Sequence, residues 1–105
     1  MNTQFKKGII ELCVMKLVND KDMYGLEVIE TISKEIEVNE NTIYPILRRL
    51  TKQGYFDTYK EAEGVGAPRK YYRLTSEGIE RLDESLYEWT QFLTRVTRIL
   101  GGTTA

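Results

Sequence analysis

The chain has 105 residues, a length that suits one small domain with a single hydrophobic core. Charged residues make up 30% and apolar types 41%, which is typical of a soluble globular protein rather than a disordered one. The sequence has no histidine and one cysteine, so it cannot build a Ser/His or Cys/His catalytic pair, a histidine-ligated metal site or an internal disulfide. We therefore expect no enzymatic activity, no metal and no cofactor.

No apolar run approaches the roughly 18 residues that a membrane span needs, and the N-terminus lacks a signal-peptide pattern. These features predict a cytoplasmic protein with no membrane partner. The net charge is −1, but it is unevenly distributed. Residues 41–75 carry seven basic and three acidic side chains, a net charge of +4, whereas the segments before and after carry −3 and −2. A local basic face is the electrostatic signature of a nucleic-acid partner.

The first predicted helix covers about residues 5–18 and carries apolar residues on every side. Such a helix is buried on more than one face, so we expect it to contact its own core and a second surface. Cys13 lies within this apolar run, which favours a buried core thiol over a redox sensor. Residues 19–22 are polar and predict a turn, with Asp22 as the N-cap of the next helix.

The second predicted helix covers residues 23–36, with Gly25 on its apolar side. A glycine within a helix costs about 1 kcal/mol of helix propensity. We expect that a neighbouring helix approaches the backbone closely at Gly25.

The third predicted helix follows Asn39, its expected N-cap, and ends near Gln53 and Gly54. Pro45 does not suit a helix interior, so the helix either starts later or bends there. One side of the helix is apolar, consisting of Ile43, Ile46, Leu47 and Leu50. The opposite side carries Asn41, Tyr44, Pro45, Arg48 and Lys52, flanked by Thr42 and Arg49.

Residues 55–60 and 69–74 are rich in aromatic side chains and are separated by a glycine-containing segment, which predicts a β-hairpin packed against the helices. Alternation along the second strand predicts that one of Tyr71 and Tyr72 is buried and the other exposed. Glu61 and Glu63 near the tip either repel phosphates or pair across the hairpin with Arg69 or Lys70.

The last predicted helix begins at Thr75 or Ser76 as N-cap and runs for about 25 residues, about 37 Å at 1.5 Å per residue. Its apolar residues follow alternating spacings of three and four, which is a heptad pattern. They are Ile79, Leu82, Leu86, Trp89, Leu93, Val96 and Leu100. Because this helix is longer than the rest of the domain, a second copy of the chain is needed to cover it. Gly101 and Gly102 end it, and we expect a frayed tail.

The order of elements predicts a mainly α fold with a β-hairpin wing (α+β), a winged helix-turn-helix followed by a long C-terminal dimerisation helix. Residues 1–75 are assigned to the DNA-binding part and residues 76–105 to the dimerisation helix and tail, as one compact unit. The third helix has the properties of a major-groove reader, because one side is anchored in the core and the other presents amide, hydroxyl and guanidinium groups.

Three motifs resemble those of the PadR-type transcriptional regulators, over about residues 5–100. They are Tyr24-Gly25, the segment TIYPILRRL at residues 42–50 followed by Gly54, and the segment RKYYRLT at residues 69–75 followed by Gly78. The resemblance implies a homodimeric repressor that binds an inverted-repeat operator and leaves it when an effector binds. The single C-terminal helix is similar to the compact subfamily. The DNA-facing positions that the resemblance implies are Asn41, Thr42, Tyr44 and Arg48 in the third helix, with Arg69 and Lys70 in the wing and Arg49 and Lys52 as phosphate contacts.

Trp89 lies in the middle of the apolar seam, where it packs in the dimer core. The resemblance to the compact subfamily, whose central dimer cavity can hold flat aromatic compounds, implies the alternative that Trp89 stacks on such a ligand. The residues expected to line such a site are Leu86, Trp89, Phe92, Leu93 and Val96. Leu93 offers no carboxylate one turn beyond Trp89, which favours an apolar or neutral aromatic effector over a cation.

Another function remains open. A winged-helix module that binds an acidic protein partner, without reading DNA sequence, is compatible with the overall net charge of −1 and the acidic wing tip.

Overall fold

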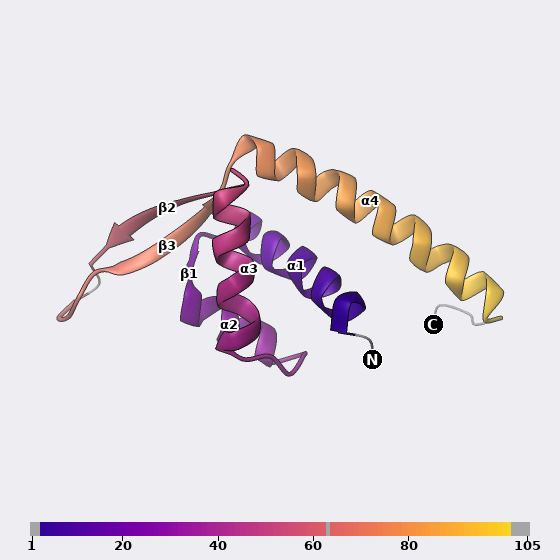
Figure 1. Cartoon of the computed structure of the whole chain (residues 1–105), viewed down its shortest axis with the longest axis horizontal. Helices are drawn as coiled ribbons and strands as arrows, with labels where there is room; N and C mark the ends of the chain where they lie inside the picture. Colours follow the sequence, from indigo (N-terminus) through magenta and orange to yellow (C-terminus); the bar gives the residue numbers. More distant parts are fainter. Residues whose placement is uncertain (1–2, 63, 102–105) are drawn as a thin grey trace.

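The computed structural model describes residues 3–62 and 64–101, with the backbone alone over residues 3–6. The elements in chain order are α1 (Thr3–Asp20), β1 (Met23–Tyr24), α2 (Gly25–Ser33), α3 (Glu40–Lys52), β2 (Phe56–Glu61), β3 (Arg69–Leu74) and α4 (Ser76–Ile99). The chain is elongated, 54 × 28 × 24 Å. Helices α1, α2 and α3 gather in the middle, the sheet projects to one side, and α4 extends to the other (Figure 1). This is the predicted α+β winged-helix architecture with a long C-terminal helix.

The core lies where α1, α2 and α3 meet the base of the sheet. The predicted apolar side of α3 is confirmed, because Ile43, Ile46, Leu47 and Leu50 are fully buried. The other elements contribute Ile10, Val14, Met15, Val18, Met23, Val28, Ile32, Phe56, Tyr72 and Leu82. Each fully buried side chain of this size stabilises the fold by about 1.5–3 kcal/mol, so these residues fix the orientation of α3.

The second helix is shorter than predicted, and its predicted start is wrong. Residues Met23–Tyr24 form the strand β1, which pairs antiparallel with β3 and gives a three-stranded sheet in the order β1-β3-β2. The N-cap of α2 is Tyr24 rather than Asp22. Asp22 instead accepts a hydrogen bond of 2.7 Å from the hydroxyl of Tyr59 in β2, so its carboxylate anchors the wing.

Tyr71 and Tyr72 of β3 lie on opposite faces of the sheet, but the expectation that one of them is exposed is wrong, because their exposed fractions are 7% and 6%. Tyr72 faces the helical core, where its ring lies 6.0 Å from that of Phe56. Tyr71 is covered on the other face by Tyr24 and Tyr59, each with a ring centroid 5.5 Å from its own. The two faces of the sheet are therefore both covered near its base, one by helices and one by tyrosines.

Helix α3 begins at Glu40 and contains Pro45, so of the two alternatives for this proline the later start is wrong. Its predicted N-cap is confirmed, since the side chain of Asn39 accepts a hydrogen bond from the backbone N–H of Asn41 at 2.9 Å. Gly54 follows with φ +85°, the left-handed conformation that ends a helix at little cost for glycine.

Helix α4 is tied to the wing by Thr75 and Gly78. The hydroxyl of Thr75 accepts a hydrogen bond from the N–H of Gly78 at 3.0 Å and donates to the carbonyl of Gly54 at 2.7 Å. A Cβ added to Gly78 would lie 2.3 Å from the carbonyl oxygen of Tyr55. The first turn of α4 therefore fits against the end of the α3–β2 connection only without a side chain at position 78.

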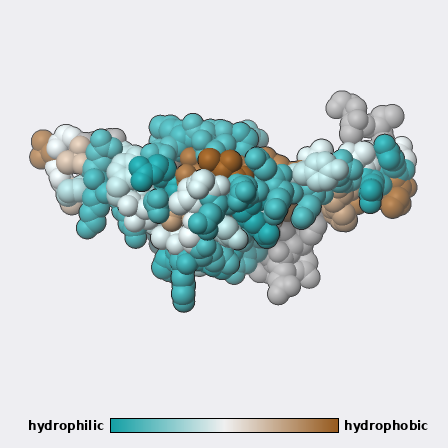
Figure 2. All heavy atoms as spheres, turned by 90° about the horizontal axis from the view of Figure 1, so that it is seen from above, coloured by the Kyte–Doolittle hydropathy of each residue, from teal (hydrophilic) through white to brown (hydrophobic). Residues whose placement is uncertain are grey.

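The C-terminal half of α4 presents apolar side chains to solvent. Phe92 is 54% exposed, Leu93 47% and Ile99 83%, and Leu100, the C-cap of the helix, is 77% exposed. Figure 2 shows hydrophobic surface at the far end of this helix. Helix α1 likewise has side chains on two sides of its buried stripe that are only half-buried, among them Leu12, Cys13 and Leu17. Residues 102–105, predicted to be a frayed tail, and Glu63 of the wing tip lie outside the described residues.

Candidate nucleic-acid interface and adjoining hollows

The side of α3 opposite the core carries polar side chains, as predicted. Asn41, Arg48 and Lys52 are exposed, whereas Thr42 and Tyr44 are half-buried. Since the apolar side of α3 is fully buried, the backbone positions these groups with little freedom. An arginine and an amide on a fixed helix are the groups that form paired hydrogen bonds with guanine and adenine edges.

Tyr44 is held by a close contact with α2. A Cβ added to Gly25 would lie 2.5 Å from Cε1 and 3.1 Å from the hydroxyl oxygen of Tyr44. The expected close approach at Gly25 is therefore confirmed, but the approaching group is a tyrosine ring rather than a helix backbone. Only glycine leaves room for the ring at this position.

Basic side chains of the wing lie over tyrosine rings. The guanidinium of Arg69 is 4.5 Å from the ring centroid of Tyr24, and Lys70 Nζ is 5.7 Å from that of Tyr72. Cation–π contacts of this kind position a charge while leaving it accessible. Sequence reasoning identified the basic residues but not the tyrosines beneath them.

A shallow hollow of about 320 Å³ lies between α3 and the sheet. Its lining combines the start of α2, the wing and α3, namely Tyr24, Gly25, Leu26, Tyr44, Arg69, Lys70 and Tyr72. Burial raises the pKa of Tyr72, the nearby Tyr44 raises it further, and the positive charge of Arg48 lowers it. Of the predicted DNA-facing residues, Tyr44 of α3 and Arg69 and Lys70 of the wing line the same hollow.

Arg49 is directed differently from Arg48. Its Nη2 donates a hydrogen bond to Oε2 of Glu11 in α1, and the two side chains form an ion pair with exposed fractions of 36% and 29%. Arg49 was predicted as a phosphate contact, and the structure places its guanidinium against α1.

Acidic groups of the wing lie opposite basic ones. In the register of the hairpin Glu61 faces Arg69, and Asp57 faces Arg73 with an ion-pair distance of 3.9 Å. The Asp57–Arg73 pair is exposed and contributes at most about 1 kcal/mol. The predicted cross-hairpin pairing therefore has the right register for Glu61.

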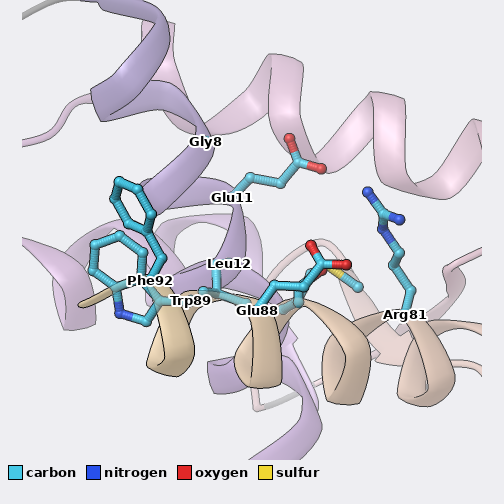
Figure 3. A pocket seen from close by; sticks show the side chains of 9 residues that line it. Gly8, Glu11, Leu12, Arg81, Glu88, Trp89 and Phe92 are labelled. Atoms are coloured by element: carbon cyan, nitrogen blue, oxygen red, sulfur yellow. The ribbon is translucent and has the colours of Figure 1, made fainter. Parts of the chain in front are cut away.

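A second hollow, of about 380 Å³, lies between α1 and α4, and we call it the α1–α4 hollow. It is lined by Gly8, Glu11, Leu12 and Met15 of α1 and by Arg81, Ser85, Glu88, Trp89 and Phe92 of α4. Figure 3 shows the rings of Trp89 and Phe92 at one end, and Glu11, Glu88 and Arg81 toward the other. The ring centroids of Trp89 and Phe92 are 6.4 Å apart.

A third hollow, of about 390 Å³, lies on the other side of α1 and is mostly apolar. Helix α2 contributes Thr31, Ile32, Glu35 and Ile36, and α1 and α4 contribute Leu12, Cys13, Lys16, Leu17, Leu86 and Trp89. Trp89 therefore lines both hollows. Burial raises the pKa of the Cys13 thiol, which disfavours the reactive thiolate.

The residues predicted to surround an effector are brought together only in part. Leu86, Trp89 and Phe92 line the hollows beside α1. Leu93 is exposed and Val96 is half-buried farther along α4, and neither lines any of these three hollows. Sequence reasoning missed Glu11, because nothing in the helical pattern of α1 indicates that this carboxylate pairs with Arg49 of α3 and lines the hollow beside α4.

Two kinds of site are absent from residues 3–62 and 64–101. No group of three or more cysteine, aspartate or glutamate side chains there is arranged to hold a metal ion. None of the helices in this part of the chain has the length and apolar character needed to cross a membrane.

The chain is similar to known transcriptional regulators along most of its length. Residues 14–84 match the model of the transcriptional regulator PadR-like family. A PadR-like transcriptional regulator of Bacillus cereus is 32% identical, with a TM-score of 0.86 over 96% of this chain and 100% of that one. A protein of Streptococcus mutans is 34% identical, with a TM-score of 0.85 over 91% and 90% of the two chains. An uncharacterised protein of Lysinibacillus sphaericus is 33% identical over 81% of this chain and 82% of its own.

Proposed function

The chain belongs to the PadR-like family of transcriptional regulators, and from that membership we propose that it is a homodimeric repressor of an inverted-repeat operator. When a small aromatic or apolar effector binds to the protein, the protein dissociates from the operator. As a member of this family the protein is a DNA-binding regulator, a class that acts by binding rather than by catalysis.

The observation that carries the proposal is the meeting of α3 and the wing on one basic surface. Arg48 and Lys52 of α3 are exposed, and Tyr44 lines the same hollow as Arg69 and Lys70 of the wing. In a winged helix-turn-helix, one helix lies in the major groove of DNA while the wing follows the DNA phosphate backbone. This requires that the helix and the wing present their polar and basic side chains to the same side. We assign Asn41, Thr42, Tyr44 and Arg48 to base edges, and Lys52, Arg69 and Lys70 to phosphates.

The exposed apolar side of α4 supports the dimer. Burial of an apolar side chain stabilises a protein by on the order of 1.5–3 kcal/mol, so packing of these exposed side chains against a partner surface is favoured. The half-buried residues of α1 offer a surface of matching character, on which the partner's α4 packs. In this arrangement residues 1–75 form the DNA-binding part, and residues 76–105 form the dimerisation helix and tail. Together they make one compact unit.

The effector is assigned to the neighbourhood of Trp89. Its indole ring lines two hollows and lies beside Phe92, which suits stacking on a flat ring. The α1–α4 hollow also contains Glu11, Glu88 and Arg81, so an aromatic compound that carries one polar group fits better than a wholly apolar one.

The experiment that tests the function is a selection from genomic DNA. The purified protein is mixed with sheared DNA of the source organism at near-physiological salt, and the retained fragments are sequenced. We expect a few fragments that share an inverted repeat. Uniform retention, or none, would contradict sequence-specific binding and favour a winged-helix module for an acidic protein partner.

A further inference from the structure

Glu11 belongs to two surfaces at once. Its carboxylate accepts a hydrogen bond from Arg49 of α3, which follows Arg48 directly in the chain. The same side chain lines the α1–α4 hollow together with Glu88 and Trp89 (Figure 3). The described structure thus has a direct polar contact between the wall of this hollow and the helix that carries Arg48.

The contact is placed so that it constrains α3. Both side chains are only about a third exposed, so the pair is screened by salt less than a fully exposed one. On the buried side α3 is held by side-chain packing, and the Glu11–Arg49 pair adds a directional contact beside it. A charge-assisted hydrogen bond fixes both the distance and the orientation of the groups that it joins.

We propose that Glu11 is a positioning residue, which couples the α1–α4 hollow to α3 through Arg49. A change in the hollow that draws the Glu11 carboxylate away weakens the hold on Arg49 and shifts the orientation of Arg48. The inference rests on the proposed DNA binding by α3. Coupling between two sites is reciprocal, so binding of DNA at α3 must also alter the surroundings of Trp89.

Trp89 is the one tryptophan of the chain and lines the same hollow as Glu11, so its fluorescence reports on that side of the coupling. The probe is a short labelled duplex that carries the sequence enriched in the genomic selection. Label anisotropy measures DNA binding, and tryptophan emission is recorded at saturating DNA. For the wild type we expect a change in emission on binding. For Glu11→Gln we expect the duplex to bind while the change in emission falls by more than half.

Two further variants separate coupling from local effects. Glu88→Gln removes a carboxylate from the same hollow but leaves the Glu11–Arg49 pair intact, so the emission response to DNA is retained. Arg49→Gln breaks the pair from the α3 side without changing the lining of the hollow, so the response disappears at DNA concentrations that saturate this variant. Circular dichroism and thermal unfolding check that each variant is folded.

The outcomes are distinguishable. Absence of DNA binding by the wild type in the anisotropy measurement would refute the proposed function, and with it the inference. DNA binding without any change in Trp89 emission would refute the coupling alone. An equal change in emission for wild type and Glu11→Gln would also refute it, as would retention of the full response in Arg49→Gln or its loss in Glu88→Gln.

Discussion

The ring of Tyr44 lies directly over Gly25, so that a Cβ at position 25 would come within 2.5 Å of the ring. This contact joins the start of α2 to the proposed DNA-reading side of α3, next to the hollow that the wing shares. Because glycine has no Cβ, position 25 leaves space for the Tyr44 ring, and this space determines where the Tyr44 hydroxyl lies.

Replacing Gly25 by alanine is expected to displace the Tyr44 ring and to weaken specific DNA binding several-fold. The atoms that the added Cβ would meet belong to the Tyr44 side chain rather than to the backbone, so the ring can move aside and the variant is expected to remain folded. Titration of labelled operator by anisotropy measures the loss of affinity. Affinity equal to that of the wild type would show that the position of Tyr44 is not needed for binding.

Arg48 and Lys52 are both exposed on α3, but we expect different consequences when each is replaced by alanine. Arg48→Ala removes a hydrogen-bonding group from a base edge, so it costs about 1–3 kcal/mol at one position of the operator and reduces discrimination there. Lys52→Ala removes a charge that neutralises a phosphate, so it weakens binding to all duplexes and lowers the salt slope by about 0.9 for that phosphate.

Titrations against operator and scrambled duplexes at several salt concentrations separate the two effects. Because both side chains point away from the core, the helicity of each variant should equal that of the wild type. A uniform decrease in affinity for Arg48→Ala would reassign it to a phosphate, and loss of folding would contradict its exposed position.

Gly78→Ala is expected to destabilise the protein by about 1–3 kcal/mol, because the added Cβ would lie 2.3 Å from the backbone oxygen of Tyr55. Denaturant unfolding measures the free energy. Gly8→Ala in α1 is the matched control, since a Cβ there meets nothing within 4 Å and alanine raises helix propensity. Equal stability of the two variants would mean that α4 shifts freely relative to the wing.

The hydrogen bond from Tyr59 to Asp22 predicts a pH dependence of the wing. This bond raises the pKa of Tyr59 to about 12, and the negative charge of Asp22 adds to the effect. The unfolded chain titrates near 10, so the folded state binds the phenol proton more tightly. The stabilisation is complete below about pH 10 and is lost as the pH rises through about 12.

The test is a titration of tyrosine absorbance in the wild type and in Asp22→Asn, with Tyr59→Phe to identify the group. In Asp22→Asn the pKa of Tyr59 should fall toward 10. Identical titration curves for wild type and Asp22→Asn would show that the carboxylate does not hold the phenol.

Leu93→Glu is expected to give monomers that remain folded. Leu93 is 47% exposed on α4 and lies outside the core of the single chain, so a carboxylate there disrupts only a partner surface. Sedimentation equilibrium measures the mass, and unfolding followed at several protein concentrations reports the loss of dimer stability. A variant with the mass of a dimer would place the interface elsewhere. Glu84→Gln, at an exposed position of the same helix, is the control.

Elements with a long and regular pattern were predicted well from sequence. The apolar side of α3, the cap at Asn39 and the cap at Thr75 all depend on local spacing, and each is confirmed. Strand β1 was missed because a segment of two residues, Met23–Tyr24, is too short to show the alternation of a strand. Their strand conformation depends on pairing with Tyr71 and Tyr72, which are distant in the sequence.

The candidate site was predicted as a set of residues but not as an arrangement. The spacing within α3 indicated that Arg48 faces away from the core, because helical periodicity is a local property. It gave no information on the partner of Arg49, since Glu11 lies 38 residues earlier and the contact depends on how α1 packs against α3. The burial of both Tyr71 and Tyr72 was missed for the same reason, because the side chains of Tyr24 and Tyr59 cover the second face of the sheet.

The most direct test of the central claim is a hydroxyl-radical footprint on a fragment enriched from genomic DNA. Two copies of α3 in a symmetric dimer must reach major grooves whose centres are about 34–36 Å apart, or a multiple of one helical turn. We predict two protected half-sites of inverted sequence at this spacing, and weaker protection of both at the same protein concentration with Arg48→Ala. A single protected segment, or protection spread evenly along the fragment, would contradict a dimer that reads two half-sites through α3.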